Sequence, residues 1–172
     1  MKPTRIILTL AIIFSLTNYS KTQDTVSDIA DYASIREFPQ PVGWVNDFEH
    51  ILSISEIETL DSIISNFYQE TLNAIAVVTV NSIEPYQEIE DFSAALTNHW
   101  GVSRNRNNGL IIVLSKNLDQ VWFGTGLRTQ KKLPDEVCID IINEDMKPYF
   151  VNNKHYEGLC KGIQACINEL NQ

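Results

Sequence analysis

The two most apolar stretches of the chain predict strands at the centre of a sheet. Residues 74–80, AIAVVTV, are almost wholly apolar and rich in β-branched side chains, and residues 110–114, LIIVL, form a second run of this kind. Such runs are typical of strands covered on both faces. Between them, apolar residues recur at helical spacing across residues 89–100, and Gly101 is a natural helix terminus. The pattern predicts a parallel strand–helix–strand unit.

Three further segments show the apolar spacing of amphipathic helices. The first begins with Ser53 and Glu56, which have the spacing of a capping box, and Ser55 with Glu58 is an equally good box. Helices that alternate with strands along a chain indicate an α/β fold. The predicted bounds of these helices are Ser53 to about Thr71, Pro134 to Pro148, and about His155 to Leu170.

A hairpin is predicted where the polar linker 115–120 joins the strand at 110–114 to an apolar run at 121–123. Its antiparallel second strand makes the sheet mixed, so we expect a three-layer α/β/α sandwich with a small mixed sheet. A hairpin brings the start of its first strand beside the end of its second. Asn107 to Gly109 should therefore lie next to Gly124 to Gly126. Because glycine lets a backbone approach a ligand closely, this sheet edge is the first candidate site.

The N-terminal residues differ in composition from the rest. Residues 1–23 combine a basic start, an uncharged apolar run at 6–16 and a small polar stretch, which is the pattern of a signal peptide. A short membrane anchor is the alternative. We expect residues 24–41 to form a flexible arm and residues 42–172 to form one domain. No second long apolar run follows, so we expect no membrane span in the mature chain, which would be periplasmic or secreted.

The chain is acidic, with a net charge of −9. Cleavage near Gln23 removes three basic residues and no acid, which leaves 10 basic against 22 acidic residues, a net charge of about −12. Such a surface disfavours nucleic acid and anionic lipid as partners and attracts divalent cations. We expect a monomer.

The three cysteines cannot all pair with one another. Cys160 and Cys166 are six residues apart on one predicted helix, so they point in different directions. Cys138 could pair with either of them, or all three could be buried thiols. Both interpretations remain open at the level of sequence.

Six spaced motifs stand out along the chain. They are Val45-Asn-Asp47 with Leu52-Ser53, Thr71 with Ile75-Ala-Val-Val-Thr79, Trp100-Gly101 with Asn108-Gly109-Leu110, Gly124-Thr-Gly126, Leu133-Pro-Asp135, and Met146-Lys-Pro-Tyr-Phe150 with Tyr156-Glu-Gly158. Each motif is weak alone, but their order and spacing are specific. Together they resemble the TPM domain, a family found in bacterial exported proteins and in thylakoid-lumen proteins linked to photosystem II repair. The resemblance runs from about Val42 to Leu170.

The resemblance implies a similar sandwich fold and one of several functions. Members of the family are credited with acid phosphatase activity, with binding calcium or other divalent ions, and with accessory roles for membrane protein complexes. This chain has Asn108 and His155 at two positions where the family usually has Asp. Each change removes a negatively charged candidate ligand.

Calcium prefers six to eight oxygen ligands, and the predicted sheet edge offers several. Asp47 is the other acidic landmark of the family and is kept as a candidate ligand, although the topology places it less surely. The alternatives are a helix first-turn acid for Asp135 and a simple turn for Asn108. The candidate ligands of a divalent ion, calcium or magnesium, are Asp47, Thr71, Asn107, Asn108 and Asp135.

A phosphate site is the second chemical possibility at the same edge. Arg104 and Arg128 flank Gly124 and Gly126 and could hold a phosphoryl group, although exposed arginines are more often solvated loop charges. The sequence shows no phosphate-binding loop with Lys and no paired-Asp motif, so no catalytic residue is assigned.

Three functions are therefore expected, in this order. The first is an exported TPM-domain module that binds a divalent cation, calcium before magnesium, and supports another exported or membrane protein. The second is a metal-dependent acid phosphatase acting on phosphate monoesters. The third is an interaction domain without a ligand.

Overall fold

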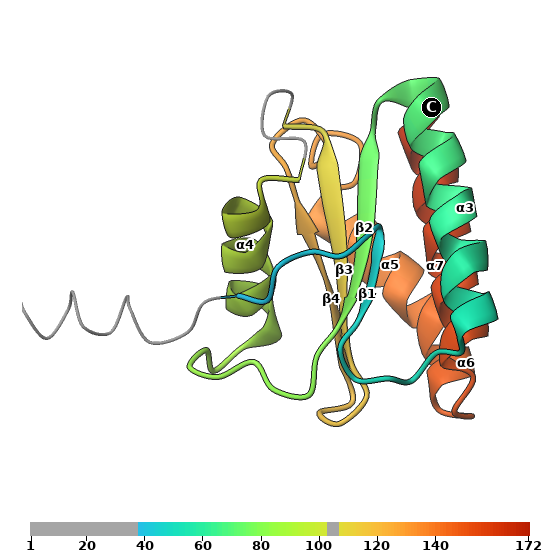
Figure 1. Cartoon of the computed structure of the whole chain (residues 1–172). Helices are drawn as coiled ribbons and strands as arrows, with labels where there is room; N and C mark the ends of the chain where they lie inside the picture. The colour runs from blue at the N-terminus through green and yellow to red at the C-terminus, as the bar shows by residue number, and fades with distance from the viewer. Residues whose placement is uncertain (1–37, 103–106) are drawn as a thin grey trace, which may run out of the picture. The chain divides into compact units, whose positions relative to one another are not determined.

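The computed structural model describes residues 38–102 and 107–172. The predicted signal peptide and residues 24–37 of the predicted arm lie outside the described residues. The elements are β1 (Val45–Asp47), α3 (Ile54–Thr71), β2 (Ala74–Thr79), α4 (Ile89–Trp100), β3 (Gly109–Ser115), β4 (Gln120–Thr125), α5 (Asp135–Ile141), the π-helical turn η1 (Ile142–Met146), α6 (Lys147–Phe150) and α7 (His155–Leu170) (Figure 1).

The four strands form one mixed sheet in the order β1-β2-β3-β4. β1, β2 and β3 are parallel, and β4 is antiparallel to β3. Figure 1 shows α4 on one side of the sheet and α3, α5 and α7 on the other. The predicted α/β/α sandwich is confirmed, and β1 adds a fourth strand to the three that the sequence predicted.

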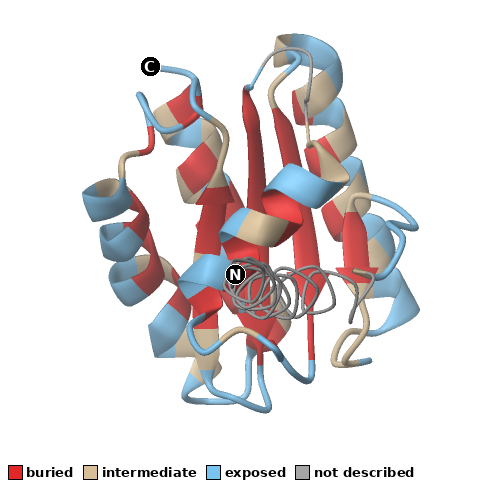
Figure 2. Cartoon of the chain, turned by 90° about the vertical axis from the view of Figure 1, so that its left-hand side faces the viewer, coloured by how far each residue is buried: buried red, intermediate tan, exposed pale blue. Residues whose placement is uncertain are grey.

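Two apolar cores, one on each face, hold the layers together. Because side chains alternate along a strand, Ile112 of β3 packs against α3, α5 and α7, whereas Ile111 and Val113 pack against α4. All residues of β2 and β3 are buried, as the red strands of Figure 2 show. This explains why their sequences carry no polar alternation.

The ends of two helices follow from local sequence. Ser53 and Glu56 form the predicted capping box at the start of α3, and Gly101 ends α4 in the left-handed conformation. The predicted end at Pro148 is wrong. α5 stops at Ile141, the turn η1 follows, and Pro148 lies in the first turn of α6, where its missing N–H costs no hydrogen bond.

In the part of the chain that the structure describes, no helix is long and apolar enough to cross a membrane.

Candidate functional site

The strands give the sheet two chemically different ends. The amino end is the edge where β2 and β3 begin and β4 finishes, at Ala74, Gly109 and Thr125. The carboxyl end is the edge where β1 and β2 finish, at Asp47 and Thr79. Ligands of open α/β sheets usually bind at the carboxyl ends of the strands.

The predicted juxtaposition at the amino end is confirmed. The backbone N–H of Gly126 donates to the carbonyl of Gly109 at 2.8 Å, and the N–H of Arg128 donates to the carbonyl of Asn107 at 2.8 Å. Asn107 is exposed and has a positive φ of 53°. Arg104 lies outside the described residues.

Asn108 connects the start of β3 to the end of α3. Its side-chain amide donates to the carbonyl of Leu72 at 2.7 Å and lies 3.0 Å from the side-chain oxygen of Asn73. Its own carbonyl accepts from the N–H of Ala74 at 3.2 Å. Asn108 thereby holds the two parallel strands in register at their first residues.

Thr71 joins the same group of residues. Its hydroxyl donates to the carbonyl of Phe67 at 2.7 Å and accepts from the N–H of Asn73 at 3.1 Å. The amino end thus gathers Thr71, Asn107 and Asn108. Asp135 is the first residue of α5, so it is a first-turn acid of that helix, and Pro134 precedes it as the N-cap.

The glycines of the amino end are packed against the chain itself. A Cβ on Gly126 would lie 2.7 Å from the carbonyl oxygen of Asn107. A Cβ on Gly124 would meet the hydroxyl of Thr97 and lie 2.7 Å from the carbonyl oxygen of Ser93. The space immediately in front of these two glycines is therefore filled by the backbone of Asn107 and by α4.

Asp47 lies at the carboxyl end, across the sheet from the other predicted ligands. Its carboxylate accepts a hydrogen bond from the hydroxyl of Thr79 at 2.5 Å. It also accepts from the N–H groups of Ile51 at 3.2 Å and Leu52 at 2.8 Å. These bonds shape the loop that carries the chain from β1 to α3, and they occupy both carboxylate oxygens.

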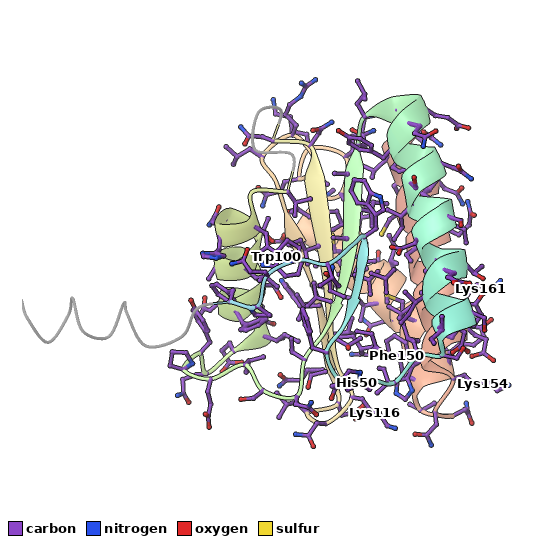
Figure 3. All side chains as sticks on the ribbon, in the orientation of Figure 1. His50, Trp100, Lys116, Phe150, Lys154 and Lys161 are labelled. Carbon is purple, nitrogen blue, oxygen red and sulfur yellow. The ribbon has the colours of Figure 1, made fainter. Side chains whose placement is uncertain are left out.

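Glu49 is a second carboxylate at the carboxyl end, which sequence reasoning missed. Its two oxygens accept from the N–H groups of Lys116 and Asn117, each at 2.9 Å, in the turn between β3 and β4. Figure 3 shows the side chains of His50 and Lys116 at this end. The partners of Glu49 are 67 and 68 residues away in sequence, so no local pattern could have identified this contact.

His155, which stands where the family usually has Asp, is buried at the start of α7 and stacks on Phe150 with ring centroids 5.7 Å apart. Burial lowers the pKa of His155, and the charge of Lys116 lowers it further. A neutral imidazole packed on an aromatic ring fits a structural role in this position.

The three cysteines are free. Burial raises the pKa of Cys138 to about 12 and raises the pKa of Cys166 well above its ordinary value. Because the thiolate is the nucleophile, these two buried thiols are poorly suited to covalent catalysis.

Among the residues with described positions, no three His, Cys, Asp or Glu side chains are grouped so that they could hold a metal ion. The predicted ligands accordingly fall into separate sets, with Asp47 at the carboxyl end and Thr71, Asn107 and Asn108 at the amino end.

An open groove of about 340 Å³ runs beside the first half of β4. One wall is the start of α4 with Glu88, Ile89 and Glu90, and the floor includes Gln120 and Trp122. The opposite wall is formed by α5, η1 and α6. Its residues are Ile139, Ile142, Asn143 and Lys147.

Comparison with known proteins agrees with the architecture. The model of the TPM domain matches residues 45–169. The solution NMR structure of the N-terminal domain of a protein from P. gingivalis is 32% identical, with a TM-score of 0.68 over 74% of this chain and 82% of that chain. No curated protein matches.

The N-terminal domain of the cg2496 protein from Corynebacterium glutamicum is 17% identical, with a TM-score of 0.58 over 78% of this chain and 84% of that one, and shares the fold. The match to the family model covers most of the chain and both faces of the sheet. The chain belongs to the TPM domain family.

Proposed function

We propose that this TPM-domain chain is an exported accessory module that acts by binding another exported or membrane protein. The observation that carries the proposal is the open groove beside β4, the last strand of the sheet. The groove exposes part of the outer side of this strand between two helical walls. Ile139 of α5, on one wall of this groove, is 39% exposed. A partner would cover both features.

The hydrogen bonds of the candidate ligands support a binding role over catalysis. Asp47 and Asn108 hold a loop and a strand in place through their side chains. A phosphatase needs an activated nucleophile and a group that stabilises the phosphoryl charge. Side chains that already serve the scaffold would have to give up those bonds to take such roles.

Crosslinking in living cells tests the accessory function. Cells that produce the full chain are treated with a short amine-reactive crosslinker, and adducts of the chain are identified by mass. We expect one reproducible adduct with a protein of the same compartment. The function is wrong if no adduct forms while the purified chain hydrolyses a phosphate monoester in the presence of calcium or magnesium.

We propose a divalent cation site in a narrower form than the sequence predicted, restricted to the amino end. The oxygens of Thr71, Asn107 and Asn108 support this proposal, because hard cations prefer hydroxyl, amide and carbonyl oxygens together with carboxylates. Asp135 is the candidate carboxylate. With so few charges the site would be weak, with a dissociation constant of about 10⁻³ M or higher.

A two-dimensional NMR titration of the full chain with calcium, then with magnesium, tests whether a cation binds at the amino end. Amide shifts should group at Asn107 to Gly109 and at Gly124 to Gly126. The amides of Ile51 and Leu52, which bond to Asp47, are the internal control and should not move. Shifts confined to those two amides would place the cation at the carboxyl end and contradict the proposal, as would no shifts at all.

A further inference from the structure

We propose that the free edge of β4 accepts an added β-strand, namely an extended partner segment in which basic residues alternate with apolar ones. The inference rests on the proposed partner-binding function and specifies where the partner docks and what chemistry it presents. Extended segments that add to a sheet gain affinity from main-chain hydrogen bonds and specificity from alternate side chains.

The hydrogen-bond register shows which backbone groups of β4 point outward. The N–H of Gly126 donates to the carbonyl of Gly109, so these opposed residues form a hydrogen-bonded pair. In an antiparallel ladder such pairs alternate with non-bonded pairs. The alternate residues Val121 and Phe123 are opposite Leu114 and Ile112 in non-bonded pairs. Their N–H and carbonyl groups therefore point away from β3.

β4 is the last strand in the sheet order, so within residues 38–102 and 107–172 no strand pairs with its outer side. The groove beside it is lined by residues from α4 and by residues from α5, η1 and α6. Ile89 belongs to the core on one face of the sheet, and Ile142 belongs to the core on the other. A groove that contacts both layers and β4 must lie along the sheet edge, where an added strand would lie.

The two walls of the groove differ in charge and polarity. On the α4 wall, Glu88 and Glu90 are exposed. On the opposite wall, Ile139 is 39% exposed and Ile142 is buried behind it. Successive side chains of an added strand point to opposite faces. Lys or Arg would therefore face the acidic α4 wall, and Val, Ile or Leu would face the isoleucines.

Lys147 favours the same alternation of basic and apolar side chains in the partner, because it lies on the wall of Ile139 and Ile142, here called the isoleucine wall. A cation on this wall disfavours a basic partner side chain that faces it. Basic residues of the partner are thereby restricted to the α4 face. The groove specifies a pattern of side chains as well as an overall charge.

Gln120 is a further indication that a ligand enters the groove. It lies on the floor of the groove, and its side-chain oxygen is buried without a hydrogen-bond partner within residues 38–102 and 107–172. A buried unpaired acceptor costs free energy. A Lys or Arg of the added strand, placed on the α4 face, would supply the missing donor.

Two other possible occupants of the groove, residues 24–37 of this chain and a second copy of the chain, are less compatible with the acidic α4 wall. Residues 24–37 of this chain carry Asp24, Asp28, Asp31 and Glu37 against one basic residue, Arg36. A second copy paired through β4 would bring two acidic α4 walls together. Like charges in such positions repel, so a basic partner strand is favoured over both.

A synthetic peptide tests the inference on the full chain. The probe is an acetylated ten-residue peptide in which Lys and Val alternate, and the control peptide has five Lys followed by five Val. With the alternating peptide, we expect NMR shifts and slowed amide hydrogen exchange at Val121 and Phe123. The block peptide should bind at least about fivefold more weakly, because it cannot present one chemistry to each wall.

Matched variants locate the peptide. Ile139→Arg replaces an isoleucine with a second cation on the isoleucine wall, which already carries Lys147, and should abolish binding, whereas Leu127→Arg changes another exposed apolar residue, 70% exposed and outside the groove, and should not. The double variant Glu88→Gln/Glu90→Gln should weaken binding roughly fivefold, as expected for two exposed ion pairs. Glu58→Gln/Glu70→Gln on α3 is its control. Circular dichroism checks that each variant is folded.

Several results would overturn the inference. They are shifts that map away from β4, equal binding of the two peptides, and protection of Val121 and Phe123 in the free chain, which would mean that the edge is already occupied. In the cellular crosslinking, an adduct that persists undiminished in Ile139→Arg, which adds a positive charge but no reactive amine, would reject the β4 edge and leave the accessory function standing. Loss of the adduct in that variant, with retention in Leu127→Arg, would support both.

Discussion

Replacing Gly124 with alanine should destabilise the fold by about 3 kcal/mol, near the upper end of the usual cost of overpacking. A Cβ at this position would overlap the hydroxyl of Thr97 and approach the carbonyl oxygen of Ser93 to 2.7 Å. Both atoms belong to α4, whose packing on β4 closes one face of the sheet. The backbone carbonyl cannot rotate away, so the helix itself would have to move.

Gly43→Ala is the matched control for this change. A Cβ there would lie 3.4 Å from the nearest atom, a carboxylate oxygen of Asp61 at the end of a flexible side chain. Its effect should stay within about 0.5 kcal/mol. Urea unfolding followed by circular dichroism measures both free energies of unfolding. Equal stability of the two variants would mean that α4 does not pack closely on Gly124.

The second large effect is expected for Asp47→Ala, which should lower the free energy of unfolding by about 2–3 kcal/mol. The substitution removes the acceptor of the Thr79 hydroxyl and of the N–H groups of Ile51 and Leu52. Partly buried donors that lose a charged acceptor keep the desolvation cost without the bond. The loop between β1 and α3 should loosen first, which hydrogen exchange of Leu52 would detect.

Asp135→Ala is the control for Asp47→Ala, because both residues are acids of the predicted metal site. Asp135 lies in the first turn of α5, where a carboxylate contributes only about 0.3–1 kcal/mol through the helix dipole. Unfolding should be measured with and without calcium. If Asp47→Ala were no more destabilising than Asp135→Ala in the absence of calcium, the hydrogen bonds of Asp47 would not be structural. A ligand role for Asp47 would then be favoured.

The amino end of the sheet was predictable because its neighbours are fixed by short-range rules. A hairpin with a short linker dictates which residues of its two strands are opposed. The pairing of Leu110 with Thr125 and the contact of Gly126 with Gly109 follow from that register. Sequence reasoning placed these residues together correctly, but it assigned the glycines to a ligand. Only packing showed that α4 and the backbone of Asn107 fill the space in front of them.

The carboxyl end was harder to predict because its contacts join distant segments. Asp47 belongs to a strand of three residues, too short for a periodic pattern. Its position depends on pairing with β2, which is more than 30 residues away. The contact of Glu49 with the β3–β4 turn spans a still longer stretch of sequence. Neither contact leaves a signal in the spacing of nearby residues.

The sequence by itself determined the sandwich fold, the bounds of most helices and strands, and the membership of the TPM domain family. Hydrophobic periodicity records which side chains are buried, and caps and turns record where elements begin and end. The tertiary structure decided that Asp47 lies across the sheet from Asn108, and that β4, the last strand of the sheet among the described residues, is flanked by a groove between α4 and the isoleucine wall. These properties depend on the order of strands and on the helices that flank them, which long-range packing sets and local pattern does not encode.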